Sequence, residues 1–238
     1  MIGVTFGIKH SYDDFGLILS SKEIGLPEPK LEKVSVIGRN GDIDLTDALC
    51  DTVTYNNRLL SFTFSLPNAH VYWTRVLSDL SNYLHGKRMR VILDADKTFY
   101  YYGRCAINSF KTNKTLGIIV VDCDVEPYKI EVNSASDPWL WDPFSFVDGI
   151  IHQIEYTLSA TTQTIDLINR AKVVSPTFTI SAGGAVMITH NADIYSIIAD
   201  ANASKTVTIY DIRLQEGDNY ITAVGTGTLR ITYRGGSL

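Results

Sequence analysis

The chain has 238 residues, of which 45% are hydrophobic and 20% are charged. This balance is typical of a globular protein with one large or two modest domains, and it excludes long disordered regions. The formal net charge of −5 argues against a nucleic-acid coat, because such a coat needs a broad basic face.

The first half of the chain predicts strands around a single helix. Phe15–Leu19 is a short apolar run, Val34–Ile37 alternates in polarity, and Asn40-Gly41 follows. Because Asn and Gly both tolerate positive φ, this pattern predicts a β-hairpin over about residues 31–46. A half-buried strand is predicted where apolar residues alternate with polar ones, at Leu60, Phe62, Phe64 and Leu66.

A helix is predicted over about residues 69–85, with Gly86 at its C-terminal end in a left-handed conformation. Its apolar stripe consists of Trp73, Val76, Leu77, Leu80 and Leu84. Lys87, Arg88 and Arg90 suit the negative end of the helix dipole, and a phosphate or partner contact is the lesser alternative. Further strands are predicted at Arg90–Leu93, Phe99–Ile107 and Leu116–Cys123.

A seam divides the chain into two domains. Residues 1–135 hold 15 of the 21 Lys and Arg residues, so that half is near neutral, whereas residues 136–238 are acidic. Pro and small polar residues gather between the halves and break regular structure. We expect an N-terminal domain at 1–133, a linker at 134–149 and a C-terminal domain at 150–238.

The second domain is predicted to be all β. Turn residues separate eight candidate strands at a spacing typical of a two-sheet, jelly-roll-type sandwich. Glycines at 183–184, 217, 225 and 227 mark the expected turns. The candidate strands are Ile150–Leu158, Thr164–Asn169, Thr177–Ile180, Ala185–His190, Ser196–Asp200, Thr206–Tyr210, Asn219–Val224 and Thr228–Tyr233.

The residues predict no active site, metal site or cofactor site. A nucleophile needs a base and an orienting group, but no GxSxG or HExxH pattern occurs. The three cysteines, Cys50, Cys105 and Cys123, are odd in number and widely spaced. We expect three reduced, buried thiols in a chain made in a reducing cytoplasm, with no disulfide framework. No apolar run nears the ~20 residues of a membrane span, and no secretory signal is expected at the start.

Two tryptophans at the seam are the most distinctive aromatic residues. Trp139 and Trp141 lie on one face of any extended segment, because they are two residues apart. Exposed Trp faces stack on sugars, which suggests a glycan platform. Apolar contacts that join the two domains are the favoured interpretation, because both residues lie at the seam.

The order of motifs resembles the distal tail proteins (Dit) of long-tailed, siphovirus-type bacteriophages. The opening Phe6–Ser11, followed by Asp14–Leu17, is similar to the start of that family. Lys33–Thr46 resembles the family's V-x-V-x-G-R-[ND]-G-x-x-D hairpin, and Tyr55–Arg58 continues the same order. Leu214–Ile221 and the last strand resemble the family's galectin-like C-terminal domain.

The resemblance implies a mainly β structural protein of the virion tail tip, made in the bacterial host. Such proteins form a homo-hexameric ring in the baseplate, through which DNA passes without specific binding. The ring joins the tail tube protein to the tail-associated lysin or fibre hub and to adhesion or receptor-binding proteins, with no membrane contact. This chain resembles the short form, which lacks an inserted carbohydrate-binding module.

The predicted hairpin is the candidate contact between ring subunits. Unpaired strand edges near its tip can pair with a neighbour, and Arg39 can bind a carboxylate there. The candidate residues are Val36, Ile37, Gly38, Arg39, Asn40 and Gly41. A hairpin folded back on its own subunit is the alternative. A cell-wall glycan-binding module for host adsorption is the alternative function, and an enzyme is least favoured.

Overall fold

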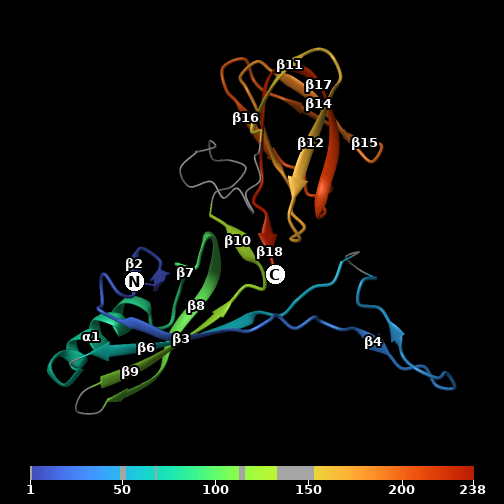
Figure 1. Ribbon diagram of the computed structural model, residues 1–238. Coiled ribbons are helices and arrows are strands. Elements are labelled where there is room, and N and C mark those ends of the chain that lie inside the picture. Colours follow the sequence, from blue (N-terminus) through green and yellow to red (C-terminus); the bar gives the residue numbers. More distant parts are fainter. Residues whose placement is uncertain (1, 49–51, 68, 113–115, 133–152) are drawn as a thin grey trace. The chain divides into compact units, whose positions relative to one another are not determined.

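The computed structural model describes residues 2–48, 52–67, 69–112, 116–132 and 153–238. The chain divides into two compact units, an N-terminal unit of Met1–Lys129 with Leu238 and a C-terminal unit of Ile130–Ser237. The predicted linker at 134–149 lies outside the described residues. Both units are built mainly from antiparallel strands, and the one α-helix among the described residues belongs to the N-terminal unit (Figure 1), so the predicted mainly β fold class is confirmed.

The N-terminal unit contains a seven-strand antiparallel path with the order β2-β1-β7-β8-β9-β6-β3. Inward side chains from several strands form its core, in which Phe6 lies edge-on to both Phe62 and Phe64, with ring centroids 6.0 and 6.1 Å apart. The alternation predicted around Leu60–Leu66 is therefore the core face of one strand. The strands are β1 (Val4–Phe6), β2 (Lys9–His10), β3 (Ile18–Ile24), β6 (Arg58–Pro67), β7 (Lys87–Leu93), β8 (Asp96–Thr112) and β9 (Leu116–Val125).

Helix α1 spans Ala69–Leu84, one residue shorter than predicted, and packs on β7, β8 and β9. Leu80 and Leu84 of its apolar stripe are fully buried in the core. Gly86 has φ of +77°, as expected after a helix end, and its N–H donates to the Cys105 carbonyl at 2.8 Å. Lys87 stabilises the C-terminal end of the helix, because its Nζ donates to the Asn82 carbonyl at 2.6 Å.

Arg88 and Arg90 belong to strand β7 instead of the helix end. The Arg88 guanidinium lies 3.2 Å from the Glu126 carboxylate and 5.0 Å from the Tyr102 ring centre. The Arg90 guanidinium lies 4.7 Å from the Tyr100 ring centre. Both cations therefore have partners within the sheet.

The C-terminal unit is organised around one 16-residue strand, β17 (Gly217–Thr232). On one side β17 pairs with β12 and then β11, and on the other side with β14 and then β13. Strands β15 and β16 lie outside β14 and β13, respectively. The bounds are β11 (Glu155–Ser159), β12 (Gln163–Asn169), β13 (Thr177–Ile180), β14 (Ala185–His190), β15 (Asp193–Ile198) and β16 (Lys205–Thr208).

The sequence prediction of two strands at 219–224 and 228–233 is wrong. Gly225-Thr226-Gly227 does not form a turn, and β17 continues through it while keeping its ladder. The glycines allow close approach at this point, because a Cβ on Gly225 would lie 2.0 Å from the Ala185 carbonyl oxygen. A strand without side chains here can bend and still pair on both sides.

The two halves of this sheet share one core and form a sandwich. Ile165, Ile188 and Ile221 come from the half that contains β12 and β14. Phe178, Ile180 and Leu229 come from the half that contains β11 and β13. Because all six are almost fully buried in one cluster, the inner faces of the halves pack against each other.

Short strands β10 (Lys129–Glu131) and β18 (Gly236–Ser237) close the C-terminal unit where its first and last residues meet. The Glu131 carboxylate is buried and accepts a hydrogen bond from Arg170 Nε. Arg234 Nη1 donates to the carbonyls of Glu131 and Val132 at 3.0 and 3.1 Å. These contacts fix the segment that precedes the sandwich to the residues just after β12 and β17.

We expect Gly225→Ala to lower the free energy of unfolding of the C-terminal unit by about 2–3 kcal/mol, because its methyl overlaps the β14 backbone. Gly217→Ala is the matched control, since Gly217 has φ of +92° and open space around it. That control is expected to cost about 1 kcal/mol. Urea unfolding of the full chain measures both, and an equal loss in the two variants would contradict the close approach.

Candidate interaction surfaces

The segment Gly25–Asn57, here named the arm, continues the β3–β6 ladder beyond the core. Gly25 N donates to the Leu59 carbonyl at 2.9 Å, Lys30 N to Thr54 at 2.8 Å and Asn56 N to Glu28 at 2.8 Å. In Figure 1 the blue ribbon runs from β3 out to β4. The arm is therefore held by backbone hydrogen bonds between its two sides.

The tip of the arm is a hairpin of two short strands, β4 (Lys33–Val34) and β5 (Ile43–Asp44). Val34 pairs with Ile43, so residues 35–42 form the connecting loop. Within it, Arg39 N donates to the Val36 carbonyl at 3.1 Å, and Gly38 has φ of +85°. This combination is typical of a type II turn, which needs positive φ at its third residue.

The hairpin over 31–46 is thus present, but its predicted tight Asn40-Gly41 turn is wrong. Gly41 has φ of +78°, whereas Asn40 is not among the described residues with positive φ. A type I′ turn needs positive φ at both central residues. The chain instead uses Gly38 and Gly41 separately and makes a wider loop.

Most side chains of the arm are exposed and do not pack against the N-terminal unit. Every residue from Glu28 to Asp42 is exposed, and Ile37 is 105% exposed at the tip. Val36 and Leu31 are also exposed apolar residues of the arm. Full burial of such a side chain is worth about 1.5–3 kcal/mol, so a partner that covers Val36 and Ile37 gains substantial free energy.

The structure brings the six predicted tip residues together on one loop. Val36, Ile37 and Arg39 belong to the Gly38 turn, and Gly41 follows. No ion pair of Arg39 occurs among the described residues. Its guanidinium is therefore available to a carboxylate on another chain.

The return strand of the hairpin is fixed by a local cap. The Asp44 carboxylate accepts hydrogen bonds from the Thr46 hydroxyl and from the Thr46 N–H at 3.0 Å. These bonds hold the pKa of Asp44 below its usual value. Thr46 Oγ1 in turn accepts from Glu32 N at 3.2 Å, which ties the two sides of the hairpin together.

The base of the arm is anchored by a buried arginine, Arg58. Its Nε donates to the Pro127 carbonyl at 2.7 Å, and its guanidinium lies 5.2 Å from the Tyr101 ring centre. Burial lowers the pKa of Arg58 from its usual value. Tyr55, at the end of the arm, packs edge-on against Tyr128 with ring centroids 5.9 Å apart.

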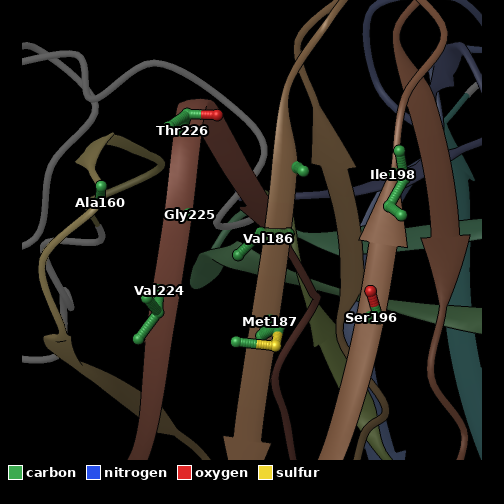
Figure 2. Close-up of a pocket in the computed structure, with 9 residues that line it drawn as sticks. Ala160, Val186, Met187, Ser196, Ile198, Val224, Gly225 and Thr226 are labelled. Atoms are coloured by element: carbon green, nitrogen blue, oxygen red, sulfur yellow. The ribbon is translucent and has the colours of Figure 1, made fainter.

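A second surface lies on the outer face of the C-terminal sandwich. A hollow of about 310 Å³ opens over β14, between β15 and the bend of β17 (Figure 2). It exists because Ala185, Ser196 and Gly225 carry little or no side chain. The exposed side chains of Met187 and Ile198 contribute to its lining.

The chemistry of this hollow favours an aliphatic side chain over a sugar. None of its lining residues is charged or aromatic, and Ser196 and Thr226 supply its only side-chain hydroxyls. A sugar ring needs several hydrogen-bonding groups and is commonly stacked on an aromatic face. On the same sheet face, Tyr220 is exposed and pairs across the ladder with Asp166 of β12, which is the better arrangement for a glycan.

The two candidate tryptophans lie outside the described residues, and two histidines of the N-terminal unit have structural roles. Trp139 and Trp141 are outside the described residues. His10 binds Asp94 through Nε2 at 3.0 Å and Asp13 through Nδ1 at 2.9 Å, and His85 Nδ1 accepts from Ile107 N at 3.0 Å. Within the described ranges, no group of three or more His, Cys, Asp or Glu residues can hold a metal ion.

Among the described helical residues, none form a helix that is both long and apolar enough to cross a membrane. The arm offers apolar side chains and a cation, and the sandwich offers an apolar hollow with Tyr220 nearby.

Comparison with known proteins identifies the fold. No family model matches the sequence, and no curated protein matches it. The chain is similar to a crystal structure titled as SPP1 Dit (gp 19.1), "a Paradigm of Hub Adsorption Apparatus in Gram-positive Infecting Phages". The TM-score is 0.65 with 13% sequence identity, and the match covers 100% of both chains. The protein thus has a Dit-like fold over its whole length.

Proposed function

We propose that this protein is a structural hub of a phage tail tip, a distal tail protein. Six copies form a ring that joins the tail tube to the tail-associated lysin or fibre hub, and adhesion proteins attach to it. DNA passes through the centre of the ring. The full-length likeness to the SPP1 Dit structure supports the fold. The exposed apolar tip of the arm is the observation that supports the proposed ring assembly.

A ring requires a heterologous interface, in which one face of a subunit binds a different face of the next. The arm meets this need because it extends away from its own core and presents Ile37 uncovered and Val36 partly exposed. Arg39 beside them supplies a cation for a carboxylate on the neighbour. The arm therefore clasps the next subunit around the ring.

The charge of the N-terminal half agrees with passage of DNA. Residues 1–135 contain 15 basic and 16 acidic residues, so this half is close to neutral. A strongly basic ring would bind the phosphate backbone and slow its movement. A near-neutral ring allows DNA to slide.

We expect Val36→Asp with Ile37→Asp to abolish ring assembly, because charged side chains cannot be buried at the clasp. Light scattering across protein concentrations measures the mass, which should be near six times 26.4 kDa for the parent. Negative-stain images should show a central hole in the parent only. Ile194→Asp is the matched control, since Ile194 is an exposed isoleucine of the C-terminal unit. Rings of normal mass in the tip variant would contradict the clasp.

The second candidate is a glycan-binding module in the C-terminal unit that recognises the host cell wall. It is favoured by Tyr220, which is 61% exposed and lies opposite Asp166. In this arrangement the aromatic ring of Tyr220 stacks on a sugar, and the Asp166 carboxylate accepts hydrogen bonds from the sugar hydroxyls. The sequence adds Trp139 and Trp141 as candidate platforms at positions outside the described residues.

For this second candidate, Tyr220→Ala is expected to weaken binding of a cell-wall polysaccharide about tenfold, or 1.4 kcal/mol. Calorimetric titration of the full chain measures the affinity. Tyr210→Ala is the control, because Tyr210 is also a strongly exposed tyrosine of the same unit. Trp139→Ala and Trp141→Ala test the seam in the same titration. The absence of saturable binding by the parent chain would remove this candidate and leave the hub proposal intact.

A further inference from the structure

Two of the three cysteines, which are widely spaced in the sequence, lie opposite each other. Cys105 on β8 pairs directly with Cys123 on β9, and both are free thiols. Cys50 lies outside the described residues.

Their backbone positions already suit a disulfide. Directly opposite residues on antiparallel strands have Cα atoms about 4.5–5.5 Å apart. A disulfide accepts Cα separations of about 4.4–6.8 Å. The two cysteines can therefore be bridged without moving either strand.

The surroundings of the pair exclude bulky reagents. Neither thiol has any exposed surface, and both belong to the core cluster that contains Leu80 and Leu84 of α1. The adjacent Cys105 thiol, together with burial, raises the pKa of the Cys123 thiol. Thiolate is therefore scarce, and the pair reacts slowly and only with a small oxidant.

We propose that Cys105 and Cys123 form an intrachain disulfide that ties β8 to β9 when the folded protein meets a small peroxide outside a reducing compartment. One thiolate attacks a peroxide oxygen, the O–O bond breaks and a sulfenic acid forms with release of water. The second sulfur attacks the sulfenic sulfur, the S–S bond forms and the S–O bond breaks with release of a second water. In total, two thiols and one hydrogen peroxide give one disulfide and two waters.

The cross-link joins two central strands of the N-terminal sheet, whose order around them is β7-β8-β9-β6. It closes a loop over residues 106–122 and restricts the unfolded chain. The chemistry does not depend on the proposed function. Only its timing does, because a tail protein is assembled in a reducing cell and then works outside it.

The test uses the full chain, reduced and freed of reductant, then treated with hydrogen peroxide. We expect the thiols titrated after unfolding to fall from three to one, with a mass loss of about 2 Da and a peptide that links Cys105 to Cys123. The midpoint of thermal unfolding should rise by about 5 °C, and dithiothreitol added to the unfolded chain should restore the free thiols.

Matched variants separate this pair from other thiol chemistry. Cys50→Ser should keep the cross-link, whereas Cys105→Ala and Cys123→Ala should lose it and gain an oxygen on the remaining thiol. Should either core variant fail to fold, peptide mapping of the parent still decides the question. Three free thiols after oxidation, a link that involves Cys50, or sulfonic acids at both positions would overturn the proposal. None of these outcomes changes the ring measurement, so the two proposals fail independently.

Discussion

Continuous backbone ladders determine where each surface of this protein lies. The pairing of β3 with β6 does not stop where the core ends but continues as hydrogen bonds along the arm. The arm is therefore extended without a core of its own. In the C-terminal unit, β17 keeps its ladder through a bend at Gly225, so one sheet encloses a core and leaves a hollow outside the bend.

Side-chain periodicity made the regular elements predictable, because burial on one face imposes it. The helix around Leu80 and Leu84 and the strand containing Phe62 and Phe64 were predicted within a few residues. Glycines gave the wrong predictions at Asn40-Gly41 and at Gly225-Thr226-Gly227. A glycine permits a turn, a bend or a close approach, and only the tertiary partners decide among them.

The candidate tip residues were predictable in position but not in conformation. The hairpin motif predicts that Val36 and Ile37 lie on one loop. The exposure of that loop is visible only in the structure, because it depends on which other residues pack against the loop. The hollow over β14 and the Cys105–Cys123 pair were missed. Both depend on cross-strand register, which sets the neighbours of a residue far away in the sequence and leaves no local pattern.

The fold alone does not determine the function, since one architecture can serve many roles. At 13% identity, the likeness to SPP1 Dit says little about which surfaces bind. The proposed assembly depends on residues whose exposure the stability of a single chain does not explain. Ile37 is fully exposed and Val36 is 42% exposed, yet the β4–β5 pair holds their loop in place. Ordering about thirty residues around uncovered aliphatic side chains is unfavourable for an isolated subunit, and it becomes favourable when a neighbouring chain covers them.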